Sequence, residues 1–211
     1  NKLNGTQLMI EILKKVNKEI DPMKVTYHHN SVRATHFEQK IKGSKDDNEH
    51  INNRMQYATE LLQAGNSNAC IKELEMLLGV LNNAGVAGAN TYNIRRMLAM
   101  AYMRLGEQAN CSGKNNEESC IIPLIGKGIY TMTSGSKAAI ELYEGMLKEN
   151  PKEYETIWLL NIAYMTIGEY PESVPKQWRI DPSKFESEYN LPAFKNIASN
   201  TILGRNGLAG G

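Results

Sequence analysis

The fold of this chain is decided by a pattern that occurs twice between Tyr92 and Glu169, first as Leu98-Ala99-x-x-Tyr102-x-x-x-Gly106-Glu107 and then as Leu160-Asn161-x-x-Tyr164-x-x-x-Gly168-Glu169. A third stretch separates the two copies and reads Ala139-x-x-x-Tyr143-x-x-Met146-x-x-x-x-Pro151. In each stretch the small, apolar and aromatic residues recur every three or four positions, which is the spacing of one helix face. The chain is therefore predicted to repeat a pair of helices.

The order of the two helix types resembles the tetratricopeptide repeat, in which a first helix ending in glycine precedes a second helix with a small residue, an aromatic residue and a terminal proline. The resemblance implies an all-α fold, a tetratricopeptide-like α-α superhelix of about two to three repeats with an N-terminal helix and an extended Pro-rich C-terminal tail. We expect three regions: an N-terminal helix and irregular connection over residues 1–47, the helical domain over 48–170 with an insertion at 109–134, and the tail over 171–211.

Hydrophobic spacing places the individual helices. It predicts a helix over residues 4–20, a pair over 51–64 and 68–81, a pair over 90–108 and 136–149, and a single helix over 154–168. Residues 23–47 have poor periodicity and form either a long connection or a helix with little amphipathic signal. After Pro171, further prolines and scattered aromatic residues predict extended chain.

The three cysteines divide into a pair and a single residue. Cys111 and Cys120 lie in a polar loop rich in Gly, Asn and Ser, and we expect a disulfide between them because exposed free thiols are avoided. The alternative is two unpaired thiols in a reducing cytosol. Cys70 falls where a helix needs a small residue against its partner, so we expect it to be buried and inert.

Composition excludes some classes of partner. With 41% hydrophobic residues the chain can bury a core, and its formal net charge of +1 gives no field that would attract nucleic acid or an anionic membrane. No apolar run reaches the length of about 18 residues that a transmembrane helix needs. Because the chain begins at Asn1 rather than methionine, we expect a leading segment, such as a secretory signal, to have been removed.

The first helices of stacked pairs line a concave surface. Counting from the signature tyrosines, the groove-facing positions are Asn52, Met55, Thr59 and Gln63 in the first repeat, Asn93, Arg96, Met100, Met103 and Arg104 in the second, and Glu155, Trp158, Ile162 and Met165 in the third. Methionines adapt to irregular partners and arginines bind carboxylates, so we expect a peptide or a neighbouring domain to bind here. The alternative is that these residues belong to the core and the chain's own tail fills the groove.

Patterns of catalytic or metal-binding residues are weak. His28, His29, His36 and His50 lack the spacing of a zinc site and have no cysteine nearby, so a solvated cluster is expected. No phosphate-binding loop, nucleophile elbow or zinc-protease motif occurs. We therefore expect no enzymatic activity, no metal and no cofactor.

Several longer stretches carry a second resemblance: residues 104–111, residues 118–123 and residues 158–171 together with Val174-Pro175. They are similar to the tetratricopeptide region that precedes FG-GAP/VCBS β-propellers in bacterial secreted proteins of the ASPIC/UnbV, cartilage-acidic-protein-like family. Residues 194–198 and 204–211 resemble the first strand of such a propeller. The resemblance runs from about Ile51 to the end and does not include the first fifty residues.

This second resemblance implies an extracytoplasmic protein, periplasmic or at the outer surface, often a lipoprotein. Its membrane contact would be a lipid anchor on a segment that this chain does not contain. We expect a non-enzymatic docking scaffold whose partner is another protein or the chain's own C-terminal domain. The alternative is a carbohydrate-binding or accessory module of a surface glycan system, with Trp178 and Tyr189 as stacking platforms.

Overall fold

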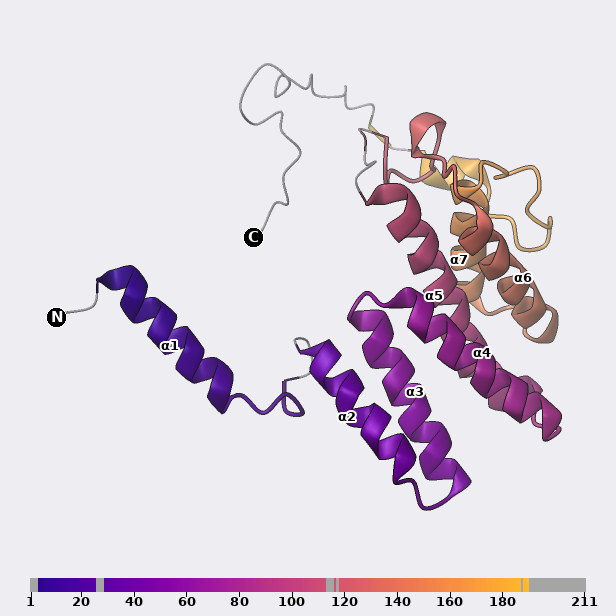
Figure 1. Ribbon diagram of the computed structural model, residues 1–211. Helices are drawn as coiled ribbons and strands as arrows, with labels where there is room; N and C mark the ends of the chain where they lie inside the picture. Colours follow the sequence, from indigo (N-terminus) through magenta and orange to yellow (C-terminus); the bar gives the residue numbers. More distant parts are fainter. Residues whose placement is uncertain (1–3, 26–28, 113–115, 117, 187, 190–211) are drawn as a thin grey trace. The chain divides into compact units, whose positions relative to one another are not determined.

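The structure, a computed structural model, describes residues 4–25, 29–112, 116, 118–186 and 188–189. Within these residues it is all-α, with no β-strand. The α-helices are α1 (Gly5–Glu19), α2 (Asn30–Lys42), α3 (Asp47–Gln63), α4 (Ser67–Asn83), α5 (Tyr92–Cys111), α6 (Ser134–Glu149) and α7 (Tyr154–Thr166), shown in Figure 1. Short 3₁₀ turns lie at Gly88–Thr91, Gly126–Gly128 and Pro182–Phe185. The predicted all-helical class is confirmed.

The chain divides into two units, Asn1–Asp181 and Pro182–Gly211. The first unit holds all seven α-helices, and the described part of the second holds the turn Pro182–Phe185. Residues 194–198 and 204–211, which we expected to begin a propeller, lie outside the described residues.

Side-chain caps set where several helices begin. The Asp46 carboxylate accepts a hydrogen bond from the Glu49 backbone N–H at 2.8 Å, and the Asn66 side chain accepts one from Ala69 at 3.3 Å. Asn4 and Gln7 form a reciprocal capping box at the start of α1. These side chains satisfy backbone donors that have no partner within the helix. The predicted helices 4–20, 51–64 and 68–81 agree with α1, α3 and α4 to within a few residues.

Each helix from α2 to α7 packs against the next along the chain, and α3 also touches α5. The core has two clusters. One joins α3, α4 and α5 through residues such as Leu61, Leu74 and Leu98, and the other joins α5, α6 and α7 through Ala99, Tyr143 and Leu160. The signature residues thus supply the contacts between neighbouring helices, as the sequence pattern predicted.

The poorly periodic segment 23–47 contains α2, so the second of the two expected possibilities is the observed one. This helix buries Ala34 and Phe37 and is otherwise attached by polar contacts. Arg33 forms an ion pair with Glu60 of α3 at 2.6 Å, and the Glu60 side chain is only 2% exposed. A helix that is held largely by a buried ion pair has a weak hydrophobic period, which is why the sequence did not distinguish it from a loop.

Helix α5 ends at Cys111, three residues beyond the predicted end at 108. The extra turn carries Asn110, whose Oδ1 accepts hydrogen bonds from the backbone N–H groups of Thr131 and Met132, each at 2.9 Å. Its Nδ2 donates to the Met132 carbonyl at 2.9 Å. The insertion therefore leaves from and returns to the same end of α5.

The expectation of an extended tail from residue 171 is wrong for residues 171–181. This segment forms turns that pack on α7, where Val174 and Trp178 are buried in the second core cluster. The buried Asn161 side chain donates to the Trp178 carbonyl at 2.8 Å and accepts from the Ile180 backbone N–H at 3.0 Å. The segment therefore covers part of α7 and completes the second core cluster.

The structure contains Cys70, Cys111 and Cys120 as free thiols, so the expected Cys111–Cys120 disulfide is not formed. Cys111 lies at the end of α5 with its Sγ 3.8 Å from the Tyr130 hydroxyl, whereas Cys120 is exposed. Cys70 is fully buried, as expected, and burial raises the pKa of its thiol to about 12. A thiol with that pKa is almost entirely protonated at neutral pH and therefore unreactive.

Candidate functional site

A hollow of about 590 Å³ lies among α3, α5, α6 and α7, and we call it the groove. It is lined by Met55, Thr59, Leu62 and Gln63 from α3, by Asn93, Arg96, Met97, Met100, Met103 and Arg104 from α5, by Tyr143 from α6 and by Leu159 from α7. Some of these residues pack on the first core cluster (Met55, Leu62 and Met97) and others on the second (Met103, Tyr143 and Leu159), because α5 contributes to both clusters. The repeat packing therefore creates the groove along the face of α5 between its two neighbours.

The structure brings together most of the groove positions that the sequence singled out. Those that line it are Met55, Thr59, Gln63, Asn93, Arg96, Met100, Met103 and Arg104. The first two repeats thus contribute nearly as counted. This agreement follows from helix geometry, since residues three and four apart share one face.

The third repeat contributes differently from the expectation. Met165 is 1% exposed and belongs to the core, so its assignment to the groove is wrong. In the first repeat Asn52 does not line the groove, and in the third neither do Glu155, Trp158 and Ile162, of which Trp158 is 42% exposed elsewhere on α7. Leu159 takes their place, because α7 is apolar on nearly all sides and its sequence does not fix its rotation.

Four lining residues were missed by the sequence count: Leu62, Met97, Tyr143 and Leu159. Leu62 and Met97 are each next to a residue that was counted, so a wider stripe would have included them. Tyr143 was recognised only as the aromatic core residue of a second helix. It is fully buried, and its hydroxyl has no hydrogen-bond partner among the described residues.

Two arginines provide charge beside this apolar surface. Arg96 donates from its Nη2 to Glu155 of α7, and Arg104 donates to Glu107 one turn further along α5. Both pairs are partly exposed, and ion pairs of that kind contribute little to stability. Since either arginine can exchange its glutamate for another acceptor at little cost, both are available to an acidic group of a ligand.

The walls of the groove are held by further polar contacts. The Thr59 hydroxyl donates to the Met55 carbonyl at 2.8 Å. Arg95 donates two hydrogen bonds of 2.7 Å to the Glu149 carboxylate and thereby joins α5 to α6. The hydrogen bonds from Arg95 hold the pKa of Glu149 below its usual value. Burial raises the pKa of Tyr143, so its hydroxyl stays protonated in the groove.

The aromatic residues proposed for sugar binding are not equivalent. Trp178 is 6% exposed and packed in the core, so it cannot present a ring face to a sugar. Tyr189 is 74% exposed. The expectation that Trp178 is a stacking platform is therefore wrong.

No group of three or more His, Cys, Asp or Glu side chains in the described part of the chain is placed to hold a metal ion. His50 accepts a hydrogen bond from Arg54 at 2.8 Å, and His36 contacts the Phe37 ring edge-on. His28 lies outside the described residues. A search for helices long and apolar enough to cross a membrane likewise found none in that part.

No protein-family model, curated protein or solved structure matches this chain.

Proposed function

We propose that this chain is a non-enzymatic protein-interaction domain with a tetratricopeptide-like helix arrangement, and that its groove binds a peptide or a neighbouring domain. The observation that carries this proposal is the groove itself, a large apolar hollow on the face of α5 that the repeat pattern assigns to ligand binding. Pockets of this size and composition are the usual places where proteins bind other molecules.

The chemistry of the lining favours an apolar segment that carries an acidic group. Met55, Met97, Met100 and Met103 present flexible, polarisable side chains that adapt to the shape of a partner. Arg96 and Arg104 lie about two turns of α5, or about 12 Å, apart, so one extended or helical segment can reach both. Such a segment would bury its apolar residues on the methionines and place its carboxylate on an arginine.

The cellular location of this function is proposed on the family resemblance alone. The resemblance to the region ahead of FG-GAP/VCBS propellers supports an extracytoplasmic protein, in the periplasm or at the outer surface, with a lipid anchor on a preceding segment. In that setting the neighbouring propeller of a longer protein is one candidate partner, and another envelope protein is the second.

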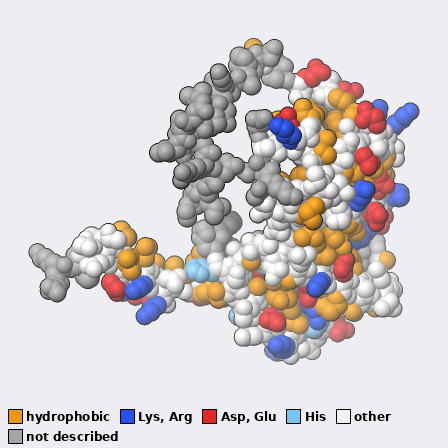
Figure 2. Space-filling model, turned by 45° about the horizontal axis from the view of Figure 1, so that its top comes forward, with side chains coloured by type: hydrophobic (Ala, Val, Ile, Leu, Met, Phe, Trp, Pro, Cys, Tyr) orange, Lys and Arg blue, Asp and Glu red, His pale blue; other side chains and the backbone are white. Residues whose placement is uncertain are grey.

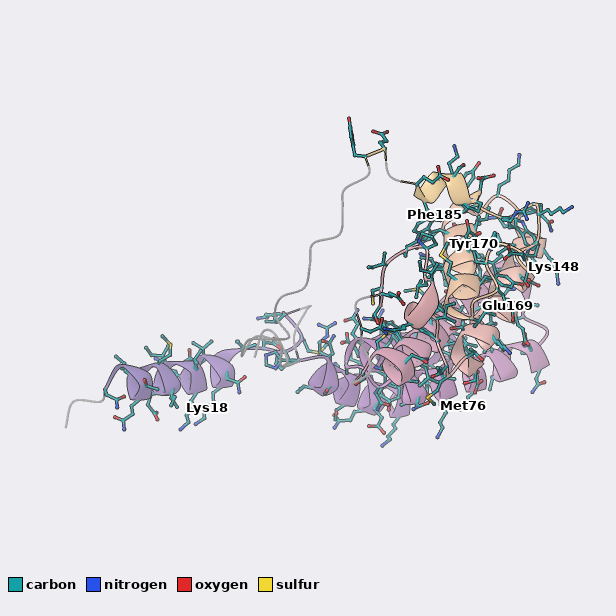
Figure 3. The ribbon with its side chains drawn as sticks, turned by 90° about the horizontal axis from the view of Figure 1, so that it is seen from above. Lys18, Met76, Lys148, Glu169, Tyr170 and Phe185 are labelled. Carbon is teal, nitrogen blue, oxygen red and sulfur yellow. The ribbon has the colours of Figure 1, made fainter. Side chains whose placement is uncertain are left out.

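The test is peptide selection on the whole chain followed by titration of the selected peptides onto two variants. Met100→Asp places a charge in the groove, and Met76→Asp is the matched control, because Met100 and Met76 are 40% and 43% exposed on different helices. Figure 3 shows Met76 on α4. We expect Met100→Asp to lower affinity by about tenfold or more, since a charged group must then be buried on binding, and Met76→Asp to leave it unchanged. Equal affinity for both variants would remove the groove from the proposal.

A further inference from the structure

Helix α1 has a continuous apolar face that the folded unit leaves uncovered. None of its residues is buried, and its large apolar side chains (Leu8, Met9, Ile10, Ile12, Leu13 and Val16) are 45–59% exposed. Figure 2 shows hydrophobic side chains at the surface of this helix beside charged ones, and Figure 3 shows Lys18 extending from it. An isolated helix of 15 residues is marginally stable in water, so α1 needs a surface to pack on.

The segment that follows α1 is attached at the rim of the groove. Asn30, the first residue of α2, donates to the Gln63 side chain at 2.7 Å, and Gln63 lines the groove. Arg33 holds the Pro22 carbonyl at 3.5 Å while it binds Glu60. Pro22 follows the last residue of α1, Glu19, by three positions, so this contact keeps the C-terminal end of α1 within about 11 Å of the Pro22 carbonyl, beside Glu60 and one turn of α3 before Gln63.

The dimensions of α1 and the groove agree. The apolar face from Leu8 to Ile20 is about 18 Å long, and the α5 wall from Asn93 to Arg104 is about 17 Å long, at 1.5 Å per residue. An amphipathic helix lying in an apolar groove is a common mode of recognition. A short tether also raises the local concentration of α1 at the groove to the millimolar range, which favours this occupant over a free partner.

The tether and the charges at its end give the direction in which α1 would lie along the groove. The tether fixes its C-terminal end near Gln63, and α5 ends beside α3 there, since Gln108 donates to the Gly65 carbonyl at 2.8 Å. Arg104 lies one turn before Gln108 and is 63% exposed. In this orientation Glu19, at the edge of the apolar face in the last turn of α1, approaches Arg104.

We propose that α1 folds onto the groove of its own chain and acts as a tethered cover that a partner must displace. This proposal uses the same groove as the proposed function, but it does not require that a partner exist. The occupant of the groove is α1 of the same molecule.

The test is hydrogen exchange by mass spectrometry on the whole chain at several concentrations, with sedimentation to give the mass. We expect slow exchange of the α1 amides in a monomer, unchanged on dilution. Met100→Asp should raise the exchange rate of α1 by about tenfold or more by opening this contact, whereas Met76→Asp should not. Rapid exchange of α1 in the unmodified chain, or no response to Met100→Asp, would overturn the proposal.

A second variant separates docking from folding. Leu13→Asp changes α1 alone, and we expect it to raise α1 exchange while α3 to α7 keep their protection. Protection of α1 that falls on dilution together with a dimeric mass would overturn the proposal in favour of the α1 of a second copy. If peptides selected for the groove bind Leu13→Asp more tightly, both proposals are supported. If the exchange rate of α1 rises in the variants but no peptide binds the unmodified chain or any variant, the proposed function fails, whereas the docking of α1 on the groove is supported.

Discussion

The ends of α5 and α7 carry the same sequence signature but use it differently. In α7 the helix stops at Thr166, and Gly168 follows with a φ of +73°, a left-handed conformation that favours glycine. In α5 the helix continues through Gly106 to Cys111, and Gly106 lies at the crossing with α6, where a Cβ added to Gly135 would be 3.0 Å from the Gly106 backbone nitrogen. One sequence pattern therefore encodes a helix stop in one copy and a helix crossing in the other.

The second position of the signature also differs. Ala99 in α5 is a buried apolar contact to α6 and α7, whereas Asn161 in α7 is buried with its amide bound to the backbone of residues 178 and 180. The Asn161 side chain thus holds the backbone of the segment that packs Val174 and Trp178 into the second core cluster. The same position of the signature is therefore an apolar packing residue in α5 and a polar anchor for the following segment in α7.

The largest loss of unfolding free energy is expected from removing the hydrogen bonds of the Asn161 side chain. Asn161→Ala deletes the hydrogen bonds to Trp178 and Ile180 and leaves buried backbone groups without partners, which should cost about 3 kcal/mol of unfolding free energy. Urea denaturation measures the loss, and the emission of Trp178 should shift to the red before global unfolding. An unchanged midpoint would show that the segment is held by packing alone.

The next test concerns the crossing of α5 and α6. A Cβ at Gly135 would lie 2.5 Å from the Tyr102 carbonyl oxygen, so Gly135→Ala must push the helices apart at a cost of about 2 kcal/mol. Gly145 lies in the same helix with no atom within 4 Å of its added Cβ, so Gly145→Ala should stabilise by about 0.5–1 kcal/mol. Thermal unfolding of both variants checks the prediction. A stabilised Gly135→Ala would contradict the close crossing.

Substitution by alanine should lower the unfolding free energy at one signature glycine and leave it nearly unchanged at the other. At Gly168 the left-handed backbone and two Ile129 side-chain atoms at 3.2 Å predict a loss of about 1–2 kcal/mol for Gly168→Ala. At Gly106 the nearest atom to an added Cβ is 3.4 Å away and the backbone is helical, so Gly106→Ala should lie within about 0.5 kcal/mol of the unmodified chain. Equal losses at both positions would remove the distinction.

The signature tyrosines should behave alike. Tyr102 donates to Glu75 of α4, and Tyr164 donates to Glu144 of α6 at 2.7 Å. Burial, aided by these glutamates, raises the pKa of Tyr102 to about 12 and that of Tyr164 further. Because the folded pKa exceeds the unfolded value near 10, the stabilisation is complete below pH 10 and is lost as pH rises toward 12. Tyr102→Phe should reduce the decrease in unfolding free energy between pH 8 and pH 11, which urea titrations at the two pH values measure.

Much of this fold could be predicted from the sequence, because apolar periodicity marks α1 and α3 to α6, and the repeated signature marks α7. What could not be predicted has physical reasons. Helix α2 depends on the buried Arg33–Glu60 pair and has little apolar period. The last residues of α5, beyond the predicted end at 108, include Asn110, whose side chain binds the backbone of Thr131 and Met132 more than 20 residues further along the chain.

The groove was predictable for the same reason that the helices were. Helices α3 and α5 are amphipathic, so counting along each helix from its signature position gave most of the lining residues from Met55 to Arg104. Helix α7 is apolar on nearly all sides, and the count failed there at Met165. The orientation of a helix that is buried all round is set by its neighbours rather than by its own sequence.

The central claim is that the face of α5 between α3 and α7 is the binding surface of this domain. The most direct measurement is hydrogen exchange of the whole chain with and without a peptide selected on it. We predict that the peptide slows exchange in α3 and along α5 from Asn93 to Arg104, and speeds exchange in α1 as that helix is displaced. Protection confined to other helices, with α5 unchanged, would contradict the claim.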